Sequence, residues 1–468
     1  MLGRYILKGA VFSLAAIVLF NACRKREGFS LPDNYIVFTS DAQGISEAET
    51  SIVIKVKLTR GTDKEIPVAI KITEQGAAYG TKYTTTPAAV AGTINITVPS
   101  GNNEASFTVN KVPGVLFDGT EKLIFDLYSS GSPILIGTTK QLTLSFAELV
   151  ATNSAYTVNG GGVTFPNKVF IDLSANRQTA VLRTNWDLGF YSEASDFRVI
   201  LNSSSAMMAK QIAKNDLNSV TAADTVGFGN EMTFSGTAPN PATLAYIDYP
   251  SGDLTKTAIA TISATASDNK VYIINRGSGV GSPSPARGWK KVRIIRNSSG
   301  GYTLQHADIT STSFSSIDVP KDAAYFFKYI SFENGLVPVE PEKKKWDIAW
   351  TYFTNIFGSG PSEAPFLFQD MILQNRNVEV AKVMISAKSY DAFAEADIAG
   401  QTFSSLQTAI GSDWRSGGGP SSGPAVRTDR YYIIKDGNNN YYKLKFTALT
   451  DAGVRGYPSI EYALVKRG

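Results

Sequence analysis

Apolar and polar residues alternate with a period of two along residues 35–147. Runs such as SIVIKVKL at 51–58 and EKLIFDL at 121–127 are short, rich in β-branched and aromatic residues, and bounded by turn residues. A period of two places successive side chains on opposite faces of a strand. Short strands spaced roughly ten residues apart are typical of an antiparallel β-sandwich. We therefore predict an all-β fold that begins with a β-sandwich over 35–147.

The remainder of the chain repeats itself. WDLGF at 186–190 recurs as WDIAW at 346–350, and VYII at 271–274 recurs at the same offset as YYII at 431–434. Self-similarity of this kind indicates a repeated structural unit. We predict two copies of one β-rich domain, at 151–312 and 313–468. The Gly- and Ser-rich runs are expected to be loops inside the copies.

Composition narrows the possible chemistry. The 468 residues are 43% hydrophobic and 11% aromatic, which excludes a disordered chain. One His and one Cys cannot build a structural zinc site or a disulfide framework. The net charge of +4 gives no strong field for nucleic acid, so no nucleic-acid partner is expected. GPSSG at 419–423 fits the letters of a nucleophile elbow, but its proline and low-complexity flanks indicate a loop, so we expect no enzyme.

The amino terminus has the features of an export signal. Basic Arg4 and Lys8 precede an apolar stretch at 10–20, which is about half of the ~20 residues that a membrane span needs. Asn21-Ala22-Cys23 follows and is similar to the lipobox of bacterial lipoproteins. We predict a signal peptide at 1–22, acylation of Cys23, a linker over 23–34, and anchoring to the outer membrane by lipid alone. The alternative is an ordinary signal peptide with an incidental cysteine.

Residues 35–147 resemble a Calx-beta-type domain. The resemblance rests on YIVFTSDAQGISEAETSIVIKVKLTR, then GTKYTT, VPSGNNEASFTVNKV and GTEKLIFDLYSS in that order. That family can bind calcium through clustered acidic residues at one end of the sandwich. Here the acidic run is reduced to Asp118 and Glu121, whereas calcium takes six to eight oxygen ligands. We therefore expect a spacer and no calcium site.

Each copy in 151–468 resembles the HmuY family of haem-capturing lipoproteins of Bacteroidetes-type bacteria. The carrying segments are KVFIDLS or KYISFEN, then WD with apolar residues, then RVILN or MILQN, and a closing set that includes KVYIINRG or RYYIIKDGNNNYYKLKF. The resemblance implies an all-β fold, haem binding without catalysis, and delivery of haem towards a TonB-dependent outer-membrane transporter for iron acquisition.

A protein that binds haem without catalysing a reaction needs axial ligands for the iron, such as His, Met, Cys or Tyr. The only histidine, His306, lies in a strand pattern and is expected to be a half-buried structural residue. A single His excludes ligation by two histidines within one domain. The remaining candidates for haem ligands are Met207, Met208, Met371, Met384, Tyr191 and Tyr352. Methionine is also ordinary core material, and edge-strand position would explain the tyrosines equally well.

The tryptophans of the WD motifs and one arginine also have expected roles. Trp186 and Trp346 of the WD motifs are expected to fill cores, because a large ring buries much apolar area. Arg415, next to Trp414 in a Gly-rich loop, is the candidate partner of a haem propionate, because guanidinium pairs with carboxylate bidentately. Two functions stay open: a lipoprotein that binds haem or a related porphyrin, and a structural or adhesive envelope protein that kept the fold and lost the ligand.

Overall fold

A computed structural model of the chain describes residues 32–45, 49–115, 117, 120–146, 153–234, 240–417 and 423–468. The predicted signal peptide at 1–22 and the lipidation candidate Cys23 lie outside the described residues, as do Asp118 and most of the linker. The predicted all-β class is confirmed, because strands in six sheets form most of the regular structure of the described residues.

The N-terminal part is a β-sandwich of two five-stranded sheets, ordered β5-β7-β3-β1-β9 and β2-β10-β8-β4-β6. Buried and exposed residues alternate along β3, as the period of two requires. The two sheets enclose one apolar core, where the rings of Phe107 and Phe125 meet edge to face with centroids 5.0 Å apart. The strands are β1 (Tyr35–Phe38), β2 (Ala42–Gly44), β3 (Ser51–Leu58), β4 (Ile66–Gln75), β5 (Tyr83–Thr86), β6 (Thr93–Val98), β7 (Glu104–Lys111), β8 (Lys122–Ser130), β9 (Leu135–Ile136) and β10 (Gln141–Ser145).

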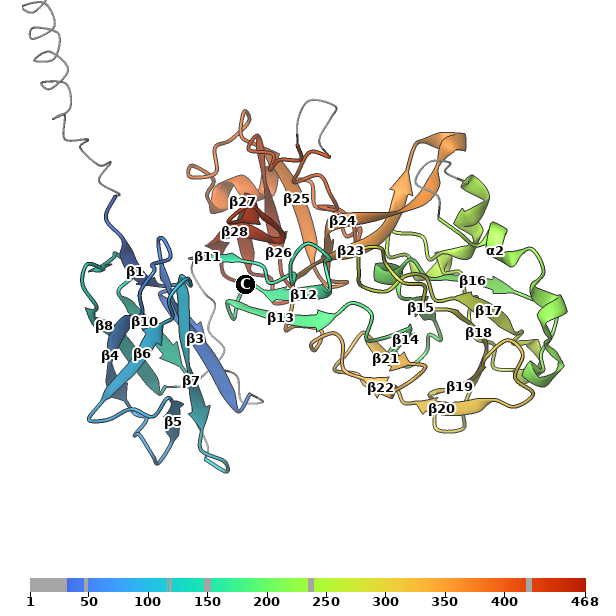
Figure 1. Ribbon diagram of the computed structural model, residues 1–468, viewed down its shortest axis with the longest axis horizontal. Helices are drawn as coiled ribbons and strands as arrows, with labels where there is room; N and C mark the ends of the chain where they lie inside the picture. Colours follow the sequence, from blue (N-terminus) through green and yellow to red (C-terminus); the bar gives the residue numbers. More distant parts are fainter. Residues whose placement is uncertain are drawn as a thin grey trace, which may run out of the picture.

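The C-terminal part contains two units that share one architecture, a five-stranded sheet and a four-stranded sheet each (Figure 1). Unit A has the orders β16-β17-β18-β19-β20 and β15-β14-β21-β22, and it is one continuous stretch of chain. Its strands are β14 (Leu188–Tyr191), β15 (Val199–Leu201), β16 (Met208–Gln211), β17 (Tyr272–Asn275), β18 (Trp289–Arg296), β19 (Tyr302–Ala307), β20 (Ser315–Val319), β21 (Phe327–Ser331) and β22 (Gly335–Val337).

Unit B has the orders β11-β28-β27-β26-β25 and β13-β12-β23-β24, and it is assembled from two separate stretches of chain. Three strands precede unit A in sequence and six follow it. They are β11 (Asn153–Thr157), β12 (Asn167–Asp172), β13 (Arg177–Leu182), β23 (Ile348–Phe357), β24 (Ala364–Gln374), β25 (Glu379–Met384), β26 (Arg430–Lys435), β27 (Tyr441–Asp451) and β28 (Val454–Lys466).

The two sequence copies exchange strands. Strand β12, from the first copy, pairs with the WD strand β23 of the second, with Val169 opposite Trp350. Reciprocally, β21 of the second copy pairs with the WD strand β14 of the first, with Tyr329 opposite Gly189. The copies at 151–312 and 313–468 therefore each contribute to both units. The sheets group the chain into units A and B, which differ from the two sequence copies. The division into copies therefore stays a proposal about the sequence repeat.

Short helical turns fill the connections, and the longest run of them, between β16 and β17, covers one side of unit A (Figure 1). They are η1 (Ser203–Ser205), η2 (Leu217–Ser219), η3 (Ala222–Thr225), α2 (Phe228–Glu231), η4 (Pro241–Tyr246), η5 (Leu254–Lys256), η6 (Ala266–Asp268), η7 (Gly360–Ser362) and η8 (Glu395–Gly400). None of the helices in the described ranges has the length and apolar content to cross a bilayer.

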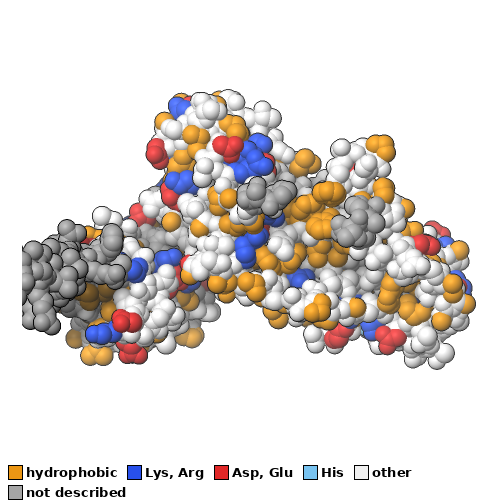
Figure 2. All heavy atoms as spheres, turned by 45° about the horizontal axis from the view of Figure 1, so that its top comes forward, with side chains coloured by type: hydrophobic (Ala, Val, Ile, Leu, Met, Phe, Trp, Pro, Cys, Tyr) orange, Lys and Arg blue, Asp and Glu red, His pale blue; other side chains and the backbone are white. Residues whose placement is uncertain are grey.

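The β23–β24 hairpin of unit B extends over unit A and joins the two (Figure 1). Thr354 Oγ1 donates to the carbonyl of Ser203 at 2.9 Å, and the hydroxyls of Thr351 and Ser204 lie 3.1 Å apart. Figure 2 shows hydrophobic side chains gathered in the hollow between the lobes of the two units. The junction of units A and B is thus held by polar bonds and by apolar contact.

Candidate functional site

The first WD motif is the centre of a buried ion cluster in unit A. Asp187 is fully buried at the start of β14, and its two oxygens accept from Arg276 Nε and Nη2 at 2.9 and 3.0 Å. Arg287 Nη2 donates to the same carboxylate at 2.8 Å, and the backbone N–H of Phe332 donates at 2.9 Å. The carboxylate therefore ties β14 to segments following β17 and β21, which is a structural role.

The second WD motif has the opposite environment in unit B. Asp347 accepts the backbone N–H of Leu173 at 2.8 Å, and Asp436 occupies the repeat position that Arg276 has in the first copy. Burial, together with the charges of Asp172 and Asp436, raises the pKa of Asp347 well above its ordinary value. Burial also raises the pKa of Asp172, to about 6. Burial therefore shifts both Asp172 and Asp347 towards the protonated form.

The tryptophans of both motifs converge between the units. Trp186 and Trp346 belong to one apolar cluster with Phe170, Phe327 and Tyr329. Trp186 meets the ring of Tyr329 edge to face at 4.7 Å, and Trp346 meets Phe170 in the same way at 4.9 Å. They fill a core, as expected from the sequence, and this core is the junction.

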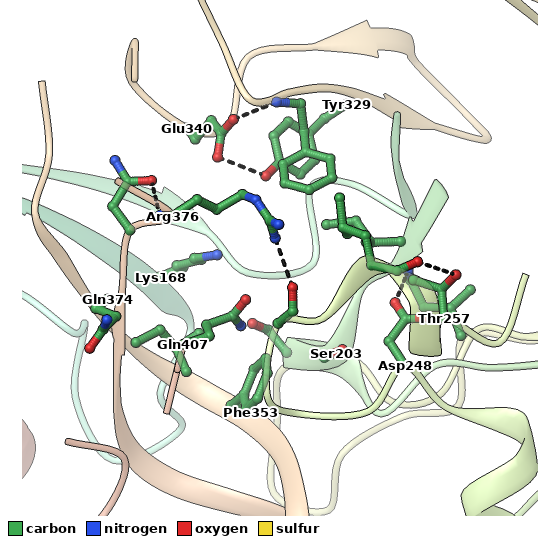
Figure 3. A pocket seen from close by; sticks show the side chains of 18 of the residues that line it. Lys168, Ser203, Asp248, Thr257, Tyr329, Glu340, Phe353, Gln374, Arg376 and Gln407 are labelled. Carbon is green, nitrogen blue, oxygen red and sulfur yellow. Dashed lines mark hydrogen bonds between the residues drawn. The ribbon is translucent and has the colours of Figure 1, made fainter. Parts of the chain in front are cut away.

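A cavity opens beside this cluster; we call it the junction cavity (Figure 3). It is narrow, with a volume of about 80 Å³, which is well below the range of about 300–1,000 Å³ usual for small-molecule sites. Unit A contributes the segment 248–257 and residues of β15 and β21, and unit B contributes β12, β24 and the residues after it. The cavity therefore exists only where the two units meet.

Two carboxyl groups in the wall of the junction cavity are the buried Glu340 and the half-buried Asp248. Glu340 accepts the backbone N–H of Phe327 at 2.7 Å with one oxygen and the Tyr329 hydroxyl at 3.0 Å with the other. Asp248 accepts the N–H of Leu201 at 2.6 Å and that of Ala258 at 3.0 Å. Burial raises the pKa of Asp248 to about 7 and also raises that of Glu340. These groups shape the walls and carry reduced charge at neutral pH.

The basic groups of the cavity are Lys168 on β12 and Arg376 after β24. Figure 3 shows both side chains extending into the cavity below Glu340. Burial lowers the pKa of Lys168, and the nearby charge of Glu340 opposes that change. None of Lys168, Asp248, Glu340 and Arg376 was a sequence candidate. No motif marks them, and they meet only through the exchange of strands between copies.

The methionine candidates lie apart from one another and from the cavity. Met207 and Met208 are buried in two different apolar clusters of unit A, and Met371 is buried in a third, with Phe353 and Leu373. The sulfur of Met207 lies 3.9 Å from Arg287 Nη1. Met384 is half-buried at the end of β25. The structure brings no two of these side chains to one cleft among the described residues.

The tyrosine candidates are also separate. Tyr191 lies against Phe327, with the Arg376 guanidinium 5.4 Å from its ring centre. Tyr352 packs edge to face on Phe165 and accepts a hydrogen bond from Gln369 at 2.9 Å. Each therefore has protein partners of its own.

Arg415 and Trp414 take structural positions. Trp414 is completely buried, stacks on Phe446 and donates its indole N–H to the carbonyl of Asp370 at 2.9 Å. Arg415 lies 3.5 Å from the buried Asp370 carboxylate, which also pairs with Arg455. As a propionate partner, Arg415 would first have to leave this ion pair.

His306 is buried on β19 beside the ring of Phe332, and burial lowers its pKa. In the N-terminal sandwich, Glu121 is buried and pairs with Lys82. Within the described ranges, no group of three or more His, Cys, Asp or Glu residues is arranged to hold a metal ion.

A family model described as HmuY protein matches residues 164–462, well over half of the chain. The chain belongs to the HmuY family. This confirms the resemblance inferred from the repeated segments. No curated protein sequence matches this HmuY-family chain.

Solved structures similar to this HmuY-family chain include an HmuY-like heme-binding protein from Bacteroides vulgatus, at 10% identity with 67% of this chain and 91% of that chain covered and a TM-score of 0.14. A two-domain protein of unknown function from Bacteroides fragilis is 11% identical, with coverages of 65% and 91% and a TM-score of 0.20. The apo form of the Calx CBD1 domain is 14% identical, with coverages of 25% and 96% and a TM-score of 0.22.

Proposed function

We propose that this chain is an exported, non-catalytic protein that binds haem or a related porphyrin-like ligand, and that the junction cavity is the binding site. The carrying observation is a cavity with aromatic walls at the meeting of two HmuY-like units. Small-molecule sites are typically concave, largely apolar and placed between domains, with a few polar groups that fix orientation. The junction cavity is concave, has aromatic walls and lies between the two units, and at about 80 Å³ it must widen to admit a porphyrin.

The binding energy comes from contacts with the ring and its edge groups. The aromatic residues of the wall are Trp186, Tyr249, Phe327, Tyr329, Trp346 and Phe353. None of the described residues that line the cavity is Met or His. The cavity would therefore hold the porphyrin ring without Met or His as a ligand of its iron.

In the envelope, lipidated Cys23 would anchor the protein to the outer membrane and the N-terminal sandwich would act as a spacer. Bound ligand would pass to a TonB-dependent transporter, and uptake would serve iron acquisition. The family match and the apolar stretch before Cys23 support this placement.

The test is a pair of titrations of the protein lacking residues 1–23, one with haemin and one with iron-free protoporphyrin IX. We expect both to saturate with similar affinity, because the ring and not the iron is held. Ile200→Trp fills the cavity from β15 and weakens both by about tenfold or more. Val163→Trp, at an exposed position, is the matched control.

Two outcomes would overturn the proposal. If the absorption spectra with protein match those of the free ligands in buffer, porphyrin binding is excluded. A low-spin haemin spectrum that disappears in Met207→Leu or Met208→Leu, with no binding of iron-free porphyrin, would establish methionine ligation instead. Leucine is close in volume to methionine, so these variants keep the core packed.

A structural or adhesive role is the second candidate. The burial of Met207, Met208 and Met371 in three separate cores favours it, because that is how methionine behaves in a scaffold. Exposed Phe357 and Phe366 on the β23–β24 hairpin offer an apolar contact surface. Two results together would support this role. Porphyrin titrations would show no binding, and a partner protein would bind the parent chain but not the Phe366→Ser variant.

A further inference from the structure

An open hollow lies on the surface where units A and B meet; we call it the outer groove. Its volume is about 380 Å³, which is within the range of about 300–1,000 Å³ usual for small-molecule sites. Unit A contributes residues 251–253 and Lys256, and unit B contributes residues 374–376 and 405–407. The outer groove shares part of this lining with the junction cavity, but it is much larger and faces solvent.

Hydrogen bonds join the two sides of the outer groove. The backbone N–H of Gln407 donates to the carbonyl of Ser251 at 3.0 Å, and Arg376 Nη1 donates to the carbonyl of Gly252 at 2.8 Å (Figure 3). Only glycine fits at position 252, where φ is +82° and a Cβ atom would lie 2.8 Å from that of Gln407. The two sides therefore have a fixed spacing, and the groove is formed before any ligand arrives.

The charged side chains of the outer groove leave an excess of positive charge. Arg376 is exposed, and its Nε and Nη2 make no hydrogen bond within the described ranges. The Lys256 ammonium lies 4.0 Å from Asp253 Oδ2, beyond hydrogen-bond distance, and 5.3 Å from the centre of the Tyr249 ring. Asp253 is the one carboxylate among the described lining residues, and its Oδ1 accepts from Thr255. Two cations with unused donors favour an anionic acceptor.

The uncharged groups of the outer groove suit hydroxyl groups and C–H faces. The side chains of Ser405 and Gln407 make no hydrogen bond to another described residue, and each can both donate and accept. Leu406, between them, is 54% exposed, and Tyr249, beside Lys256, is 38% exposed. A sugar ring carries hydroxyl groups at its edge and C–H bonds on its faces. This mixture of lining groups therefore matches a saccharide better than a simple anion.

We propose that the outer groove binds a saccharide that carries a carboxylate. Arg376 and Lys256 hold the acid group, and Ser405 and Gln407 bond to hydroxyl groups of the ring. Lys256 belongs to unit A and Arg376 to unit B, so the acid group is bound only where the units meet. This site goes beyond the proposed function and does not depend on it, because no porphyrin takes part.

The experiment compares methyl β-D-glucuronide with methyl β-D-glucoside in titrations of the protein lacking residues 1–23, followed by saturation-transfer NMR. The two sugars share one ring and differ only in the carboxylate. We expect the glucuronide to bind about tenfold more tightly, because charge-assisted hydrogen bonds are lost in the glucoside. A second pair, methyl α-D-galacturonide and methyl α-D-galactoside, repeats the comparison with another hydroxyl geometry.

Variants locate the acid group. Arg376→Met and Lys256→Met should each remove most of the preference for the acid sugar, and both positions are exposed, so the fold should be unaffected. Lys445→Met, which removes a charge on β27 outside the groove, is the matched control and should leave the preference unchanged.

Four results would overturn the proposal. Equal binding of the acid and the neutral sugar in both pairs would remove the role of the cations. Displacement of the glucuronide by an equal concentration of sodium acetate would show an anion site that does not recognise sugar. Absence of binding by both acid sugars would exclude the saccharide site, and an acid preference that survives in both variants would place it elsewhere. Each result is independent of the porphyrin titrations, so failure here and failure of the proposed function are distinguishable.

Discussion

The two WD motifs of this chain place the same dipeptide in opposite electrostatic surroundings. In unit A, Asp187 is neutralised by Arg276 and Arg287. In unit B, Asp347 has Asp172 and Asp436 as its charged neighbours, and its pKa is raised. The two copies therefore share the position of a buried carboxyl group but not its charged neighbours.

The difference has a local cause. At the end of β17, Arg276 turns inward to the carboxylate of Asp187 and also pairs with Glu333. At the end of β26, Asp436 instead accepts the N–H groups of Asn438 and Asn440 in the hairpin turn. The turn of the second copy uses an Asp at the position where the first copy places the counter-ion.

The largest expected effect is that of Asp187→Asn. The substitution leaves Arg276 and Arg287 buried without their shared carboxylate, and breaking a buried ion pair costs about 3–5 kcal/mol. We expect a loss of that size in the free energy of unfolding, measured by urea denaturation. Asp187→Asn with unchanged stability would show that the ion cluster adds nothing.

A smaller loss is expected for Arg287→Met. Arg276 still pairs with Asp187 in this variant, so the carboxylate keeps one guanidinium. The bonds from Arg287 to Asp187 and to the carbonyl of Thr184 disappear. Charge-assisted bonds of this kind contribute about 2 kcal/mol. Urea denaturation of the parent, Arg287→Met and Asp187→Asn proteins measures the free energy of unfolding of each and compares the two losses.

Asp347→Asn should have the smallest effect and the opposite sign. An acid whose folded pKa is raised stabilises the fold fully below its unfolded pKa of about 3.9 and loses that contribution as the pH rises through the folded value. An amide mimics the protonated acid at every pH. We expect thermal unfolding to be unchanged at pH 4 and the variant to be more stable by about 1 kcal/mol at pH 8. A variant less stable than the parent at pH 8 would contradict this.

Much of the fold could be predicted from local pattern. The sandwich over 35–147 and the strands of the repeat follow from the period of two and from recurring segments such as those around Trp186 and Trp346. The exchange of β12 and β21 could not be predicted. Both partners of each exchanged pair are nearly equivalent in sequence, so the pattern fits either pairing equally well.

The site could not be predicted for a related reason. Ligand chemistry favours Met207, Met208 and Arg415 as haem contacts, whereas the structure uses these side chains for packing and ion pairing. Lys168 and Glu340 belong to strand and loop patterns that carry no motif. Their role depends on a junction that only the pairing of distant strands creates.

The discontinuous make-up of unit B has a consequence for the order of folding when the chain emerges with its N-terminus first. Unit A is complete once β22 has emerged, but β11 must wait for β28, since the bonded pair Thr157 and Ser459 is 302 positions apart. There is therefore an interval in which β11 has no partner strand. During it, the nascent β12–β13 hairpin is adjacent to β14, the strand whose final partner is β21. The order of emergence therefore sets a competition between a local pairing of β12 with β14 and the exchanged pairings, which become possible only when β21 and β23 have emerged.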